Sequence, residues 1–279
     1  MKKYLLAILL VLICNLAVNA TVKGDVNGDG KVTSVDITAI YNYLIYGDST
    51  YLATSDVNGD GTISSVDITV IYNILLGIET HDYVDLGLPS GTLWATMNIG
   101  ADNPEDYGDY FAWGETESKN RYHQDNYKWG NGSSNMPKLT KYCTISSYGN
   151  NGFVDNITEL ELEDDAAYVN WGPKWRIPSR EQIEELIANC TTQISHRNGV
   201  RGRLFTSNIN GASLFFPIAG YFYITSLYHA GSFGYYWSRT LYTNKPTYAH
   251  LLYFDAGVKS GNNARIYGRS IRPVRVAQN

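Results

Sequence analysis

The chain has 279 residues, of which 44% are apolar and 18% charged, so a packed core is feasible and wholesale disorder is excluded. The formal net charge is −5 and no lysine or arginine cluster occurs beyond residue 3, which argues against nucleic acid or an anionic membrane as the main partner. With 23 tyrosines and 26 glycines, the composition is typical of an extracellular chain rich in strands and loops.

The first 20 residues have the pattern of an export signal. Lys2 and Lys3 precede an apolar run at residues 4–18, and small residues follow up to a plausible cleavage site after Ala20. The run is shorter than the roughly 20 residues of a membrane span, so no span is predicted. Cys14 would suit a lipoprotein signal, but Ile13 stands where such a signal needs a small residue. We therefore expect a secreted, extracellular protein that starts at Thr21.

Two cysteines remain after this leader, Cys143 and Cys190. Export permits a disulfide between them, and the even number fits one. Two buried thiols are equally compatible with a domain of this size, so the sequence leaves both alternatives open. Neither alternative implies catalysis.

A repeat with an offset of 31 residues follows the leader. Residues 25–36 (DVNGDGKVTSVD) return as residues 56–67 (DVNGDGTISSVD), and each copy continues into similar residues. Oxygen-bearing side chains at positions 1, 3 and 5, glycine at 6 and a carboxylate at 12 are what a calcium loop requires, because Ca²⁺ binds about six to eight oxygens. Two Asn/Gly-rich turns that bind nothing are the alternative, but uncompensated carboxylates so close together would repel one another.

The repeat therefore predicts two calcium ions, one in each loop. Position 7 contributes a backbone carbonyl, position 9 usually acts through a water, and aspartate at position 12 is shorter than the usual glutamate. The predicted ligands are Asp25, Asn27, Asp29, Lys31, Thr33 and Asp36 in the first loop, and Asp56, Asn58, Asp60, Thr62, Ser64 and Asp67 in the second.

One amphipathic helix is predicted after each loop, with no room for a helix before the first. Apolar residues recur at helical spacing, and we expect the two stripes to pack against each other. The stripes consist of Ile37, Ile40, Tyr41 and Leu44 in one copy and Ile68, Ile71, Tyr72 and Leu75 in the other. Further apolar residues on the opposite faces indicate a surface for a partner.

These loops and helices resemble a dockerin of type I, the duplicated calcium-loop module that attaches enzymes and other subunits to cohesin-bearing scaffold proteins. The resemblance covers about residues 23–79, and we assign residues 21–80 to the module. It implies that loop positions 10 and 11 and the following helix contact a cohesin domain, and that either copy could do so after a half-turn. The implied contacts are Ser34, Val35, Tyr41, Asn42, Ser65, Val66, Tyr72 and Asn73.

From Tyr83 the pattern changes to short strands and turns. A hairpin is predicted over residues 83–97 with its turn at 89–91, and a strand at 270–275 is expected beside it. Ser179 caps a predicted helix that buries Ile183, Leu186 and Ile187.

Five segments of this region resemble the Fibrobacter succinogenes major paralogous domain, a family with largely unassigned function. They are residues 85–94 (DLGLPSGTLW), 110–115 (YFAWGE), 175–180 (WRIPSR), 234–238 (GYYWS) and 268–275 (GRSIRPVR). The resemblance implies a C-type-lectin-like fold for residues 81–279, similar to that of formylglycine-generating enzymes. No cysteine pair follows Cys190, so the oxidase chemistry of those enzymes is not expected. We thus predict an α+β chain: a small all-α calcium module, then a lectin-like mixed domain of short strands and loops.

No catalytic signature is found in this region. The acidic run at residues 159–165 could supply a carboxylate pair for glycoside hydrolysis, but it is more typical of a solvated helix start. Tyrosine with serine, glycine and asparagine at residues 221–267 is the composition of antibody paratopes, although tyrosine also favours strands and cores. The candidate ligand-binding residues are Tyr228, Tyr235, Tyr236, Trp237, Tyr242 and Tyr248.

Two functions therefore stand as hypotheses. The first is a non-catalytic subunit that docks onto a cohesin scaffold of a cellulosome-like, polysaccharide-degrading assembly and binds a polysaccharide, another glycan or a cell-surface protein. The second is a glycoside hydrolase subunit with unrecognised catalytic residues, since most dockerins are attached to hydrolases.

Overall fold

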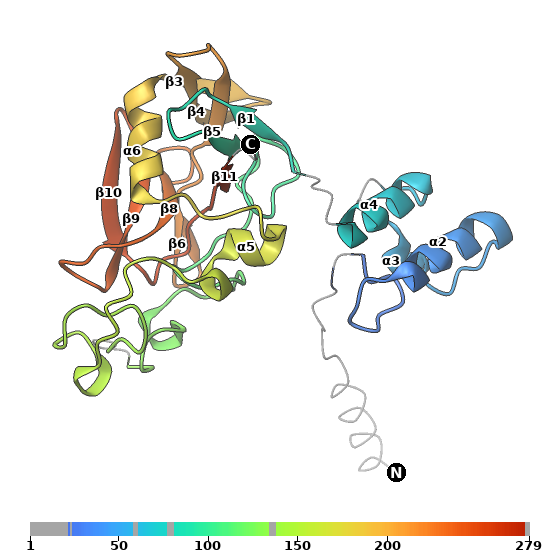
Figure 1. The fold of residues 1–279 in the computed structure, drawn as a ribbon, viewed down its shortest axis with the longest axis horizontal. Coiled ribbons are helices and arrows are strands. Elements are labelled where there is room, and N and C mark those ends of the chain that lie inside the picture. The colour runs from blue at the N-terminus through green and yellow to red at the C-terminus, as the bar shows by residue number, and fades with distance from the viewer. Residues whose placement is uncertain (1–21, 23, 58–60, 77–80, 134–137, 277–279) are drawn as a thin grey trace, which may run out of the picture. The chain divides into compact units, whose positions relative to one another are not determined.

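The computed structural model describes residues 22, 24–57, 61–76, 81–133 and 138–276, and the predicted leader at residues 1–20 lies outside them (Figure 1). The chain divides into two compact units, residues 1–80 and 81–279. Among the described residues, no helix has both the length and the apolar character that crossing a membrane requires. The described structure contains helices and strands, which confirms the α+β class.

The regular elements of the first unit, within its described residues, are all helices. Helix α2 spans Ser34–Tyr46, the short α3 spans Leu52–Ser55 and α4 spans Ser65–Leu75. Helix α2 packs against α4, as the apolar stripes predict. Helix α2 ends at Gly47, whose φ of 70° lies in the left-handed region that favours glycine.

The core of this unit is smaller than the helical stripes predict. It consists of three residues from each repeat: Val26, Ile37, Ile40, Val57, Ile68 and Ile71. The expectation that Tyr41, Leu44, Tyr72 and Leu75 pack between the helices is wrong, because all four are exposed. Val26 and Val57 from the loops complete the core, so only the first half of each stripe is covered.

The first two strands of the second unit share one sheet with its last described strand. Strands β1 (Tyr83–Asp85) and β2 (Thr92–Ala95) form the predicted hairpin, and the amide of Gly91 donates to the carbonyl of Leu88 at 2.8 Å in its turn. Strand β11 (Val274–Val276) pairs antiparallel with β2, which confirms the final strand beside the hairpin, although it begins later than residue 270.

Helix α6 (Arg180–Asn189) begins after Ser179 as predicted, and Ser179 and Gln182 form a capping box. Ile183 and Leu186 are buried, and Ile187 packs partly buried beside them. The helix packs against a sheet of β8 (Gly234–Leu241), β9 (Tyr248–Phe254) and β10 (Val258–Ala264), as Figure 1 shows.

The remaining elements are strands, one further helix and 3₁₀ turns. Strands β3 (Cys190–Arg197), β4 (Val200–Ser207) and β5 (Ser213–Pro217) form an antiparallel meander, and β6 (Tyr221–Tyr223) pairs with β7 (Ser226–Tyr228). Helix α5 and three 3₁₀ turns complete the described elements: Ala166–Trp171, Gln124–Asn126, Asn150–Gly152 and Leu162–Asp164.

The two cysteines of the second unit are buried thiols and do not form a disulfide. Cys143 belongs to one buried cluster and Cys190 to another, and both are free thiols. Burial raises the pKa of Cys143 and raises that of Cys190 to about 11, so both thiols remain protonated at neutral pH.

Candidate functional site

Two aspartates organise the first predicted calcium loop. Asp25, 7% exposed, accepts hydrogen bonds from the amides of Gly28, Asp29 and Gly30 at 2.8, 3.1 and 2.8 Å. Gly30 has a φ of 85°, so the turn at position 6 needs glycine.

At the other end of this loop, Asp36 is fully buried at the start of α2. Its Oδ1 accepts from the amides of Val26 and Asn27 at 2.8 and 3.1 Å, and its Oδ2 accepts from the amide of Thr33 at 2.7 Å. The first and last carboxylates of the motif therefore hold the backbone of the loop from opposite ends.

The second loop repeats this arrangement. Asp67 accepts from the amides of Val57 and Ser64, both at 2.8 Å, and Asp56 accepts from the amide of Gly61 at 2.9 Å. Asn58 and Asp60 lie outside the described residues, while Thr62 is exposed. The described part of the second loop matches the first, as the sequence repeat predicts.

Position 9 has a structural role that the ligand assignment overlooked. Thr33 and Ser64 are the N-caps of α2 and α4, and each accepts a hydrogen bond from the amide two residues later, at 3.1 Å. Together with Asp36 and Asp67 they form capping boxes. The signal was present in the sequence as Thr or Ser followed three residues later by Asp.

The donor set of the first loop fits a hard divalent cation. Asp25 and Asp36 are buried, and no described lysine or arginine forms an ion pair with either. A buried carboxylate without a countercharge is costly, and calcium would supply that charge. The exposed Asp29 accepts from the amide of Lys31 at 2.9 Å. The carboxylates of Asp25, Asp29 and Asp36 do not form one tight cluster.

The predicted docking residues are accessible in both repeats. Val35 and Val66 are 56% and 52% exposed, and Tyr41 and Tyr72 are 45% and 47% exposed. Ser34 and Ser65 are exposed as well, whereas Asn42 and Asn73 are half-buried. The two helices thus present equivalent apolar faces to solvent.

The predicted ligand-binding residues of the second unit separate into three groups. Tyr236 and Trp237 are 1% and 0% exposed within the core, so assigning them to a ligand is wrong. Tyr228 and Tyr235 each contact Tyr221, which joins them in one accessible group.

Tyr242 and Tyr248 form the third group. Both are half-buried, and the amide of Tyr242 donates to the carbonyl of Tyr248 at 3.2 Å. No ring contact in the described structure links them to Tyr228 or Tyr235. The nitrogen Nζ of Lys245 lies 3.9 Å from the centre of the Tyr248 ring, which covers this ring with a cation.

The acidic run is structural in part, which corrects the expectation of a solvated helix start. Asp164 is buried and accepts from Lys128 at 3.0 Å, Lys141 at 2.7 Å and the hydroxyl of Tyr142 at 2.6 Å. Burial raises its pKa, but these hydrogen bonds outweigh burial and hold the pKa below the ordinary value. Lys141 also faces Glu161 and Glu163, which form with Asp164 a three-carboxylate cluster within 4.8 Å.

The next residue, Asp165, is fully buried and caps α5. It accepts from the amide of Ala167 at 3.0 Å and pairs with Arg176 at 2.6 Å. Glu159, at the start of the run, pairs with Arg239 at 2.9 Å. Because these carboxylates have cationic partners, the run holds neighbouring segments together.

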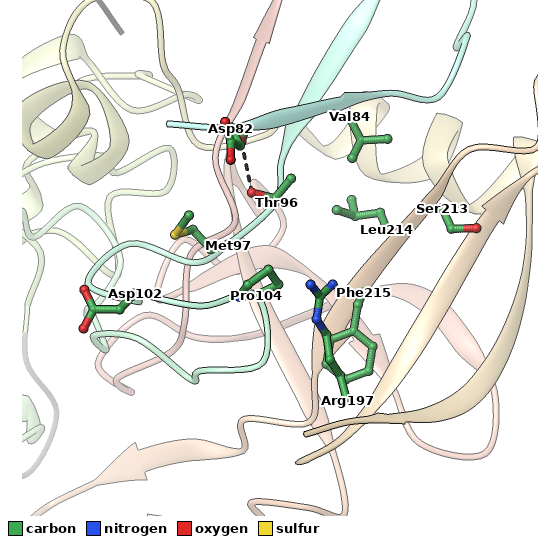
Figure 2. Close-up of a pocket in the computed structure, with 10 residues that line it drawn as sticks. All are labelled: Asp82, Val84, Thr96, Met97, Asp102, Pro104, Arg197, Ser213, Leu214 and Phe215. Atoms are coloured by element: carbon green, nitrogen blue, oxygen red, sulfur yellow. Dashed lines mark hydrogen bonds between the residues drawn. The ribbon is translucent and has the colours of Figure 1, made fainter. Parts of the chain in front are cut away.

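A pocket of about 400 Å³ lies beside β1 and β5 in the second unit (Figure 2). Its walls include apolar residues such as Leu214 and Phe215 and the charged Asp82, Asp102 and Arg197. Figure 2 shows the Asp102 carboxylate turned away from the other lining side chains. Arg197 pairs with Glu105 at 3.2 Å, so its charge is already balanced. Sequence reasoning did not identify this pocket, which has no local motif.

Comparison with known families gives a match over part of the chain. The dockerin type I domain matches residues 23–76, which contain both loops, α2 and α4. No curated protein and no solved structure matches the chain. Dockerin type I domains bind calcium and dock onto cohesin domains of cellulosome-type assemblies. Residues 23–76 of this chain are therefore similar to a dockerin type I domain.

Proposed function

We propose that this protein is a secreted, non-catalytic subunit of a cellulosome-like assembly. Residues 21–80 dock onto a cohesin domain of a scaffold protein, and residues 81–279 form a lectin-like domain that binds a glycan or a protein. The cohesin-docking part of this proposal rests on the buried carboxylates of Asp25 and Asp36 at the two ends of the first loop. The arrangement is repeated around Asp67 in the second loop.

Two calcium ions complete this unit in the proposal. The first is held by Asp25, Asn27, Asp29, the Lys31 carbonyl, Thr33 and Asp36, and the second by Asp56, Asn58, Asp60, the Thr62 carbonyl, Ser64 and Asp67. Each ion supplies positive charge between carboxylates whose backbone hydrogen bonds already shape the loop. An ion at a hundredfold over its Kd stabilises the folded unit by about 2.7 kcal/mol.

The docking face follows from the exposure of both helices. Ser34, Val35, Tyr41 and Asn42 form one contact set, and the matching residues of α4, which are Ser65, Val66, Tyr72 and Asn73, form the other. An apolar centre with polar neighbours suits a specific protein interface. Since the exposed fractions of the valines and tyrosines agree between the repeats, either helix can make the main contact with the cohesin.

A titration of the full-length protein with a panel of recombinant cohesins tests the docking half. We expect a 1:1 complex with at least one cohesin in calcium and no binding after chelation. Binding that persists in excess chelator would contradict the calcium part of the proposal. No binding to any cohesin while calcium is bound would contradict the choice of partner.

The proposal that the second unit is non-catalytic rests on the ion-pair partners of its acidic residues. In the described part, Glu159, Asp164 and Asp165 hold arginine or lysine side chains, which leaves none of these three carboxylates free for acid–base chemistry. Release of reducing sugar from a panel of plant polysaccharides by the pure protein would instead establish the glycoside hydrolase alternative.

A further inference from the structure

A buried arginine without hydrogen bonds lies in the second unit. Arg269 is fully buried, and Nε, Nη1 and Nη2 of its guanidinium have no hydrogen-bond partner among the described residues. The neighbouring buried arginines differ: Arg265 donates to Tyr127 at 2.8 Å, and Arg272 donates to Asn98 at 2.8 Å. A guanidinium left without acceptors is costly and needs another source of compensation.

Aromatic rings supply part of this compensation. The guanidinium carbon of Arg269 lies 4.4 Å from the ring centre of Tyr235, 4.8 Å from Trp237 and 5.3 Å from Tyr221. Tyr267 follows at 5.6 Å. No described carboxylate forms an ion pair with Arg269. Burial lowers the pKa of Arg269 to about 10, so it stays charged at neutral pH and places a positive charge without an ion-pair partner among the described residues under these rings.

The rings continue to the surface as a tyrosine array, defined here as Tyr221, Tyr223, Tyr228, Tyr235 and Tyr267. Tyr221 contacts Tyr228, Tyr235 and Tyr267 at ring distances of 5.7, 5.4 and 5.3 Å, and Tyr223 contacts Tyr267 at 5.1 Å. Strands β6, β7 and β8 and the segment before β11 each contribute to it. Tyr228 is 42% exposed and the other four are half-buried.

The hydroxyl groups of the array are available to a ligand. None of the five forms a hydrogen bond with another described residue, and none is among the buried polar atoms that lack partners. Burial raises the pKa of Tyr235 and of Tyr267, so these hydroxyls stay protonated and can donate. At the edge of the array, Lys259 lies over Tyr253 and Asp255 accepts from the Tyr253 hydroxyl, so these two charges balance each other.

We propose that the tyrosine array binds an anionic saccharide, a sugar that carries a carboxylate or sulfate group, and that Arg269 confers the preference for the negative charge. The rings offer flat apolar surfaces to the sugar, the hydroxyls donate to its anionic group, and the buried guanidinium attracts that group through a medium of low dielectric constant. This inference rests on the proposed glycan-binding function of residues 81–279 and specifies its ligand class.

Matched ligands test the charge preference on the full-length protein at a fixed calcium concentration. Short oligogalacturonides are compared with their methyl esters, which have the same sugar backbone without the charge, and sulfated galactan oligosaccharides form a third arm. We expect the acid to bind at least about tenfold more tightly than the ester, with the difference shrinking as salt is added. A preference for the sulfated arm also supports the proposal and identifies sulfate as the recognised group.

Substitutions test the location of the site. Tyr228→Ala and Tyr223→Ala are expected to weaken binding of the acidic ligand about tenfold, and Tyr228→Phe separates the hydroxyl from the ring. Tyr83→Ala is the control, because Tyr83 is similarly exposed at 47% and lies outside the array. Arg269→Met is expected to abolish the preference for acid over ester. Should it fail to fold, the ligand comparison and the tyrosine variants still decide the question.

The outcomes separate this inference from the proposed function. Equal, array-dependent binding of acid and ester overturns the anion preference and leaves glycan binding intact. Acid binding that Tyr228→Ala and Tyr223→Ala do not change overturns the site. No binding in any arm overturns both the inference and the glycan-binding role, and then favours a protein ligand for this unit.

Discussion

The two units of this protein are stabilised in different ways. Among its described residues, the first has a core of six apolar side chains, three from each repeat, and buries the acids Asp25, Asp36 and Asp67 beside it. The second has three larger buried clusters that include fully buried Trp94, Trp113, Trp175 and Trp237. A small core with buried acids depends on a bound cation, whereas a large core does not.

Arginine in the second unit has the role that we propose for calcium in the first. Arg265, Arg269 and Arg272 are fully buried, and Arg265 and Arg272 donate to backbone carbonyls of segments far apart in the sequence. The loops of the second unit are thus held by a charge that belongs to the chain itself. Removal of metal should therefore affect the first unit and not the second.

Chelation of the full-length protein is expected to give the largest effect and tests this difference directly. With excess chelator the first unit should unfold, since the two proposed ions would contribute an amount comparable to the whole stability of so small a domain. Hydrogen exchange measured by mass spectrometry should show loss of protection in residues 34–46 and 65–75 alone. Unchanged protection there would refute the dependence on calcium, and loss in both units would refute the contrast.

Truncation of a core tryptophan is the reciprocal test. Trp237 is fully buried, and its Nε1 donates to the Phe111 carbonyl at 2.8 Å. Trp237→Ala should destabilise the second unit by about 3–5 kcal/mol, mainly by creating a cavity. The Phe111 carbonyl stays paired in this variant, because it also accepts from the amide of Arg269 at 3.0 Å. Thermal unfolding followed by near-UV circular dichroism reports this loss, with the exposed Tyr83→Ala as control. A loss under about 1 kcal/mol would mean that the site relaxes around the change.

Charge placed on the docking faces tests their equivalence. Val35→Asp or Val66→Asp alone should weaken cohesin binding by no more than a few-fold, because the unmodified repeat still docks. The double variant should weaken binding by at least about a hundredfold, or roughly 2.7 kcal/mol, because a carboxylate is then buried in either orientation. Calorimetry in calcium measures this. A single variant that abolishes binding would show that one helix alone is used.

Acid should weaken the second unit through Asp164. Its pKa is lowered in the folded protein, so it contributes stability above the ordinary aspartate pKa of about 4, and this contribution is lost as the pH falls through the lower folded pKa. In Asp164→Asn the stability should fall at pH 7 and depend less on pH below 4. Denaturant titrations across this range measure the slope, and Glu163→Gln, at an exposed neighbour, is the matched control. Equal slopes in all three proteins would contradict this assignment.

The calcium loops, the helices that follow them and the pairing of the chain ends in the second unit could be predicted from the sequence. Each depends on local spacing: oxygen-bearing residues around Gly30, apolar residues such as Ile37 and Ile40, and the turn at Gly91. The stripe was extended too far because helical periodicity does not tell how much of a face is covered. Val26 and Val57 belong to the core, whereas Tyr41 and Tyr72 are exposed.

Composition alone could not distinguish the accessible aromatic residues from the buried ones. In β8, Tyr235 and Tyr236 are neighbours, yet alternation along a strand leaves the first accessible and buries the second in the core. The acidic run was misread for a similar reason, since the lysines that hold Asp164 come from segments more than 20 residues away. Neither the partners of a charge nor the inward face of a short strand is encoded locally.

From the sequence alone it follows that two loops share one pattern of oxygen-bearing residues, because a cation site built within twelve consecutive residues needs no distant partner. Which tyrosines reach solvent, and which cation lies beneath them, depends on the tertiary structure. Arg269 meets Tyr221, Tyr235 and Trp237 because strands β6 and β8 and the segment before β11 are brought together, and such contacts depend on packing between distant segments rather than on spacing along the chain.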